Sequence, residues 1–137
     1  MARIDVFLSA SLILSLIAIA LLCFMPQRYK AQLTILAVLA NAVLSAIISI
    51  PSLVGHEAKI MMYAGSFLGN VVVSIDGLSA WFILIINFTS LTGIIYGVGY
   101  LKGYNDNNIR ANIHWISYIL FHLSMLWVCM LQHGFAF

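Results

Sequence analysis

Long apolar runs separated by short polar stretches dominate the chain. A helix needs about 20 residues to cross the ~30 Å hydrocarbon layer of a membrane. Four runs meet this requirement, at residues 6–25, 33–50, 78–101 and 115–131. Because lipid offers the backbone no hydrogen-bond partners, spans of this kind fold as helices. The pattern predicts an all-α membrane protein with four transmembrane helices.

The stretch between the second and third runs, residues 52–75, has a different pattern. Two shorter apolar pieces flank a break rich in glycine, and the second piece contains a run of valines, residues 71–73. β-Branched residues favour strands and a glycine and asparagine break favours a turn. The sequence therefore predicts a small β-hairpin on the membrane surface, and the break disfavours another full span.

Composition restricts the class of protein further. The chain of 137 residues is 64% hydrophobic and 7% charged, more apolar than the core of a soluble domain of this size could hide. We expect an integral membrane protein, or a piece of one, whose first partner is lipid. The few charges form no basic patch, which argues against nucleic-acid binding.

The positive charges predict an orientation. The polar connections 26–32 and 102–113 carry most of them, as Arg28, Lys30, Lys102 and Arg110. The opposite side has only Arg3 and Lys59. By the positive-inside rule the two connections are cytoplasmic, so the N-terminus and the hairpin are extracytoplasmic in a multi-pass protein of the cell (inner) membrane.

Small residues mark faces where helices could pack closely. Gly93 and Gly97 continue a four-residue repeat that starts at Thr89, and Ala42 and Ala46 share a face of the second helix. Such spacing lets two membrane helices approach each other. We expect both faces to be covered by protein.

Asp76 directly precedes the third apolar run and is followed by Gly77 and Ser79. An aspartate at this position can accept a free backbone N–H of the first helical turn. We interpret Asp76 as a helix cap.

His122 is the ionisable residue placed deepest in a predicted span. Such residues are functional candidates, and histidine can hold or release a proton near neutral pH. A proton relay is therefore one interpretation. The other, which we favour because no carboxylate or lysine accompanies His122 in its span, is a neutral histidine bonded to a neighbouring helix. Asn41 and Asn87, also in mid-helix, are interpreted as hydrogen bonds between helices.

A haem site is disfavoured. His114 and His133 are separated from His122 by about 12 and 16 Å of helical rise, too far to share one metal ion. We predict no metal site and no cofactor. No phosphate-binding loop or catalytic motif is present, so we predict no catalytic residue and no enzyme activity for the chain alone.

Three segments carry a resemblance to a known family: residues 76–82 (DGLSAWF), residues 96–101 (YGVGYL), and residues 124–128 (SMLWV) with 132–137 (QHGFAF). Together with the order of spans and hairpin, they resemble the start of the antiporter-like membrane subunits of respiratory complex I, energy-converting hydrogenases and Mrp-type antiporters. The wording around the fourth span is most similar to the large membrane subunit of hydrogenase-4 and formate hydrogenlyase.

The resemblance covers essentially the whole chain but only the opening part of the family's length. It implies an N-terminal helical scaffold of a proton-translocating subunit, with the other membrane subunits of an NADH dehydrogenase-like or hydrogenase complex as partners. The family's glutamate and lysine helices would follow Phe137, so these proton-carrying residues are not in the chain. The alternative is a free-standing four-helix membrane scaffold or assembly protein without transport activity.

Overall fold

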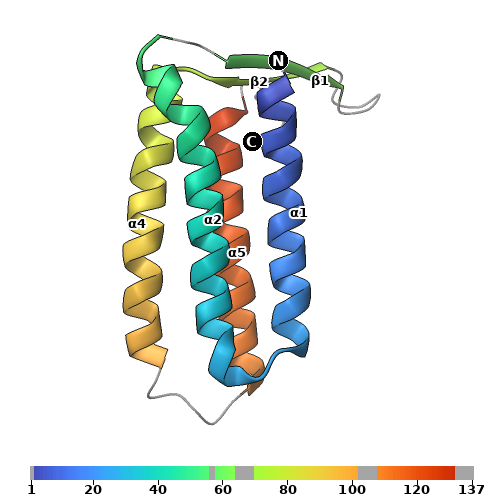
Figure 1. Ribbon diagram of the computed structural model, residues 1–137, viewed down its shortest axis with the longest axis vertical. Helices are drawn as coiled ribbons and strands as arrows, with labels where there is room; N and C mark the ends of the chain where they lie inside the picture. Colours follow the sequence, from blue (N-terminus) through green and yellow to red (C-terminus); the bar gives the residue numbers. More distant parts are fainter. Residues whose placement is uncertain (1, 56–57, 64–69, 102–107, 132–137) are drawn as a thin grey trace.

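The computed structural model describes residues 2–55, 58–63, 70–101 and 108–131. Within them, four helices run up and down beside one another, and two strands lie across one end of the bundle (Figure 1). The helices are α1 (Ala2–Phe24), α2 (Gln27–Leu53), α4 (Gly77–Leu101) and α5 (Asn108–Met130). Each is long and apolar enough to cross a membrane, which confirms the predicted multi-pass helical class.

α1 begins at Ala2 instead of residue 6, and two other helices begin still further ahead of the predicted apolar runs. α2 starts at Gln27 instead of residue 33, and α5 starts at Asn108 instead of residue 115. The apolar runs mark only the part of a helix that lipid would surround, whereas glutamine, arginine and lysine continue a helix readily beyond it. The predicted polar connections are therefore shorter than expected, and part of each is helical.

α2 also continues past the residue at which we expected it to end. Pro51 lies inside its last turn, and the helix ends at Leu53. A proline has no backbone N–H to bond the carbonyl four residues earlier, and the helix ends two residues after it. The hydroxyl of Ser52 donates to the carbonyl of Ile48 in the same turn, at 3.4 Å.

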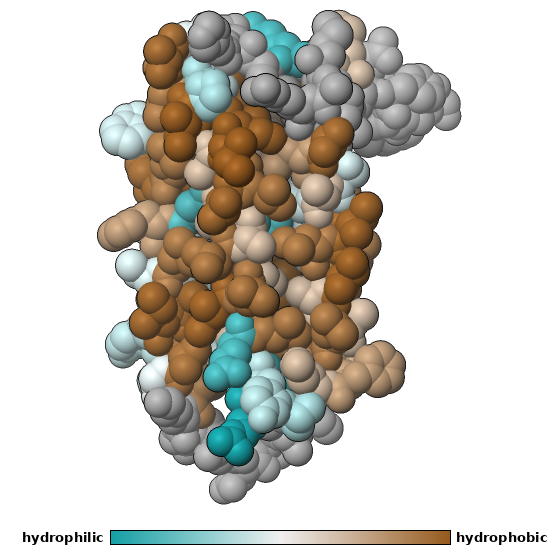
Figure 2. Space-filling view, in the orientation of Figure 1, coloured by the Kyte–Doolittle hydropathy of each residue, from teal (hydrophilic) through white to brown (hydrophobic). Residues whose placement is uncertain are grey.

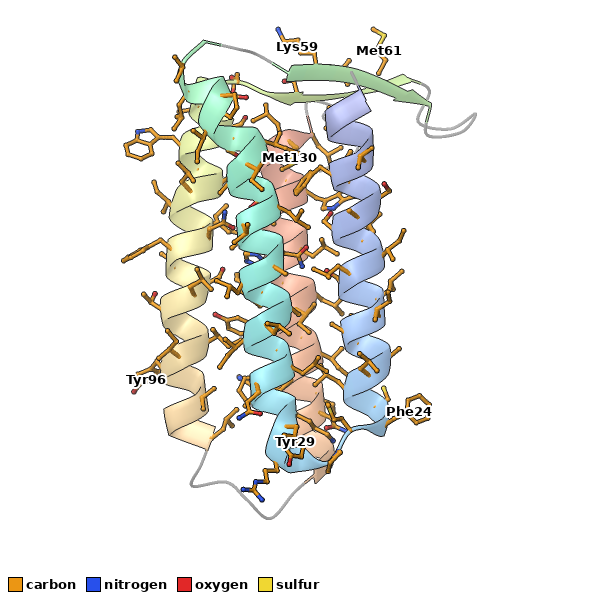
Figure 3. All side chains as sticks on the ribbon, viewed as in Figure 1. Phe24, Tyr29, Lys59, Met61, Tyr96 and Met130 are labelled. Atoms are coloured by element: carbon orange, nitrogen blue, oxygen red, sulfur yellow. The ribbon has the colours of Figure 1, made fainter. Side chains whose placement is uncertain are left out.

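The strands β1 (Ala58–Tyr63) and β2 (Asn70–Ile75) pair antiparallel, with Ala58 opposite Ile75 and Tyr63 opposite Asn70. The predicted turn between them lies outside the described residues. On β2, Val73 and Ile75 are buried against the end of the bundle. On β1, Lys59 and Met61 point away from it (Figure 3).

Apolar side chains cover the outside of the bundle as well as its inside. Figure 2 shows brown, hydrophobic atoms along most of the length of the helices, with hydrophilic residues gathered at the end where α2 begins. Large side chains point outward from every helix, including Ile13, Leu36, Phe88 and Phe121. Lipid is the environment that solvates such a surface.

The core contains two apolar clusters at different heights in the bundle. The proximal cluster, beside the strands, consists of Phe7, Leu8, Val73, Ile75, Ala80, Ile83, Leu126 and Met130. The distal cluster, towards the start of α2, consists of Ala18, Leu22, Ala37, Val38, Ile94, Trp115 and Ile119. In Figure 3 the labelled Met130 lies just below the strands, which places the proximal cluster at that end.

Candidate functional site

Buried polar residues separate the two apolar clusters. We call them the central polar layer: Ser11, Ser15, Asn41, Ser45, Asn87, Ser90 and His122. On α1, for example, Ser11 and Ser15 lie between Leu8 of the proximal cluster and Ala18 of the distal cluster. In each described helix, the layer residues lie near the middle of the apolar run. The layer therefore lies near the middle of the thickness that the bundle would span.

Two amide side chains tie helices together within this layer. The Nδ2 of Asn41 on α2 donates to the Oγ of Ser15 on α1, at 3.0 Å. The Nδ2 of Asn87 on α4 donates to the Oγ of Ser45 on α2 at 2.8 Å, and also lies 3.3 Å from the carbonyl oxygen of Ala42. The predicted role of both asparagines in bonds between helices is confirmed.

The packing of α5 places His122 at the same height as these amides. Gly97 of α4 faces His114, and Gly93, one turn back, faces Tyr118. One further turn along these antiparallel helices brings Ser90 of α4 level with His122. α2 and α5 run parallel, and Lys30 of α2 is hydrogen-bonded to Asn112 of α5. The same difference in residue number, carried along both helices, places His122 at the height of Asn41.

His122 is 1% exposed, and neither its Nδ1 nor its Nε2 has a hydrogen-bond partner among the described residues. The Oδ1 atoms of Asn41 and Asn87 also lack partners there. Buried polar groups without partners are rare and costly. The layer therefore contains hydrogen bonds between helices together with buried polar atoms that have no partner among the described residues.

The predicted packing glycines both face side chains of α5, but Gly93 is exposed and Gly97 only partly buried, so the face is not covered by protein as expected. A Cβ on Gly93 would lie 2.8 Å from the Oη of Tyr118, and one on Gly97 would lie 3.9 Å from the Nε2 of His114. The Tyr118 hydroxyl uses the space above Gly93 to donate to the Ser90 carbonyl, at 2.6 Å. Thr89 is exposed and donates to carbonyls of its own helix, so the small-residue face does not extend to it as expected.

The two alanines singled out on α2 differ in burial. Ala42 is buried and its carbonyl oxygen lies by the Asn87 amide. Ala46 is only partly buried. Both hydrogen bonds of the Asn87 amide to α2 are made in the Ala42–Ser45 turn.

A contact that the sequence did not predict lies at the distal end. The Nζ of Lys30 is hydrogen-bonded to the Oδ1 of Asn112, and Lys30 is 5% exposed. Both residues belong to stretches that the sequence predicts to be polar connections, where side chains are normally solvated. Only the helix-forming character of residues 27–32 could have indicated that Lys30 lies inside a helix. This bond links α2 to α5 at the end opposite the strands.

Asp76 lies directly before α4. Its Oδ1 accepts the backbone N–H of Ser79 at 2.8 Å, and its carbonyl oxygen accepts the N–H of Ala80. This is the geometry of a helix N-cap. The side-chain and backbone hydrogen bonds from Ser79 hold the pKa of the Asp76 carboxyl below its usual value, with a smaller contribution from the charge of Lys59.

No group of three histidine, cysteine or acidic side chains in the described part of the chain could hold a metal ion. His114 is exposed on α5, and His56 and His133 lie outside the described residues. In comparisons with known proteins, no family model, no curated protein and no solved structure matches this chain.

Proposed function

We propose that the chain is the N-terminal helical scaffold of an antiporter-like, proton-translocating membrane subunit of an NADH dehydrogenase-like or hydrogenase complex. The central polar layer is the observation that carries the scaffold role. Its two amides join α1 to α2 and α2 to α4 in the middle of the bundle. The identity of the complex rests on the similarity of residues 76–82 and 96–101 to that family.

The charges of the bundle favour a scaffold over a complete proton pathway. Among the described residues, the buried titratable side chains are Lys30, at the distal end, and His122, in the central layer. A proton pathway through a membrane needs a series of titratable or hydrated groups. Proton transfer by the chain alone is therefore not part of the proposal.

In the membrane we place the distal end in the cytoplasm. Arg28 and Lys30 lie at that end, whereas Lys59 lies on the strands at the other. The positive-inside rule then makes the N-terminus and the β1–β2 pair extracytoplasmic, in the cell (inner) membrane. The strands would cover the outer end of the bundle as a small hairpin.

Purification of the full chain in mild detergent from its native membranes tests the proposal. We expect it to copurify in stoichiometric amount with a polypeptide carrying the glutamate- and lysine-bearing helices of the family. A stable species of the chain by itself would contradict the proposal. That result would favour the free-standing four-helix scaffold.

A proton relay at His122 is the second candidate, favoured by the two unpartnered nitrogens of its imidazole. Under the scaffold proposal, His122→Phe changes how much complex assembles but not proton uptake per assembled complex. The exposed Ser124→Ala on the same helix is the control. If His122→Phe abolishes proton uptake while assembly is normal, His122 is a relay and the scaffold role is incomplete.

A further inference from the structure

Three side chains of the central polar layer have polar atoms that no described residue satisfies. These atoms are the Oδ1 of Asn41, the Oδ1 of Asn87, and both ring nitrogens of His122. The three residues are 1%, 6% and 1% exposed, so bulk water does not reach them. Ser74 Oγ and Trp127 Nε1 are also unpartnered among the described residues, but they lie with the proximal cluster beside the strands.

The orientation of the Asn87 amide is fixed by its neighbours. Its Nδ2 lies 3.3 Å from the carbonyl oxygen of Ala42, which can only accept a hydrogen bond. Turning the amide over would set two acceptors against each other. The unpartnered atom of Asn87 is therefore an acceptor. Turning over the Asn41 amide, which bonds to a serine hydroxyl, would still leave one of its polar groups unpaired.

The unpartnered groups of the layer contain more acceptors than donors. A neutral imidazole offers one N–H donor and one acceptor nitrogen. Together with the two amide oxygens, the unpartnered groups comprise one donor and three acceptors. A direct bond between the imidazole N–H and one amide oxygen would still leave two acceptors without a donor. A group that accepts from the imidazole N–H and donates two hydrogen bonds would satisfy that donor and both amide oxygens, and would leave the second ring nitrogen as an unpaired acceptor.

A protonated imidazole would supply two donors, but it would place a charge in the middle of the bundle. The other buried polar residues of the layer are serines and asparagines: Ser11 and Ser15 of α1, Asn41 and Ser45 of α2, and Asn87 and Ser90 of α4. None of these layer residues carries a negative charge to offset that of an imidazolium. A charge without a partner at membrane depth is expensive, whereas a neutral donor is not.

We propose that the central polar layer holds an internal water molecule, hydrogen-bonded to the imidazole of His122 and to the amide oxygens of Asn41 and Asn87. Water donates two hydrogen bonds, and buried waters typically make two to four hydrogen bonds with groups of this kind. The registers of α5 on α4 and on α2 bring the three side chains to one height. The site belongs to the bundle and does not rest on the proposed function.

Water-edited solid-state NMR of the full chain in hydrated bilayers tests this proposal. A variant with His56→Gln, His114→Gln and His133→Gln leaves His122 as the single labelled histidine. Magnetisation passes from water protons to the imidazole, and its build-up is compared with that of Ile119 and Leu126, which lie one turn away in the two apolar clusters. We expect the imidazole signal to build up several-fold faster than either.

The variant Asn87→Leu removes one of the partners of the water, and Thr89→Ala, at an exposed position on the same helix, is its matched control. We expect slower build-up at His122 in Asn87→Leu and no change in Thr89→Ala. The proposal is overturned if the imidazole of the single-histidine chain builds up no faster than Ile119 and Leu126. That result would mean that the layer is dry.

Discussion

At the residue scale, Asp76 is the side chain whose contribution can be isolated most simply. Replacing it with alanine removes the acceptor for the Ser79 N–H and should lower the free energy of unfolding by about 1 kcal/mol. Asp76→Ser, which keeps a capping oxygen, should lose less. Unfolding in mixed micelles, followed by tryptophan fluorescence, measures both, and equal losses would argue against the cap.

The pH dependence of Asp76 follows from its lowered pKa. Because the carboxyl is more acidic in the folded chain than its usual value of 3.8, its charged form stabilises the fold above that pH. This contribution is lost as the pH falls through the lowered pKa. The difference in stability between the natural chain and Asp76→Ala should therefore be constant near neutral pH and shrink in acid below 3.8. A difference that grows in acid would contradict this sign.

Gly93 and Gly97 provide a matched pair on α4. Alanine is the better helix former by about 1 kcal/mol, and at Gly97 its Cβ meets only an ordinary contact. At Gly93 it would displace the Tyr118 hydroxyl from the Ser90 carbonyl, which should cost about 1 kcal/mol. We expect Gly93→Ala to be the less stable variant in micelle unfolding, and adding Tyr118→Phe should reduce the gap. Equal stability of the two alanine variants would contradict this geometry.

Individual polar residues were predictable to the extent that their position in an apolar run set them apart. Asn41 and Asn87 stand out in mid-span, where an amide needs a partner from another helix. Their partners Ser15 and Ser45 do not stand out in the sequence, because serine is common in membrane helices and can bond to its own backbone. The burial of Lys30 was not predicted, because a lysine in a polar stretch is normally solvated. In the structure its ammonium group donates to Asn112 of α5, a helix far away in the sequence.

At the element scale, the link between α2 and α4 rests on the bond between Asn87 and Ser45. A double-mutant cycle with Asn87→Leu and Ser45→Ala should give a coupling of about 0.6 kcal/mol, typical of polar contacts in membranes. The same cycle with Asn87→Leu and Ser49→Ala is the control, since Ser49 bonds to the carbonyl of its own helix. Coupling of equal size in both cycles would contradict a specific contact.

The number and order of the membrane helices could be predicted from hydropathy, but their ends could not. The run 33–50 marks the apolar part of α2, while the helix itself extends from Gln27 to Leu53. Hydropathy reports the surrounding solvent, and the backbone hydrogen bonds of a helix continue for as long as its residues tolerate the conformation. The central polar layer could not be predicted from the sequence either, because it depends on the relative heights at which the described helices pack.

At the scale of the whole molecule, the apolar outer surface of the bundle requires lipid around it along its length. The apolar outer surface and the polar groups at the two ends are arranged along one axis (Figure 2). Arg28 lies at one end and Lys59 on the strands at the other, and both are exposed. If the helices cross a membrane, these two positions face opposite compartments.

Accessibility of single cysteines to a membrane-impermeant reagent is the most direct test. With Cys23 and Cys129 replaced by alanine, Arg28→Cys and Lys59→Cys are labelled in intact cells and in inverted membrane vesicles. We predict that position 59 reacts in intact cells and position 28 only in inverted vesicles. Reaction of both positions from the same side would contradict a bundle that crosses the membrane from end to end.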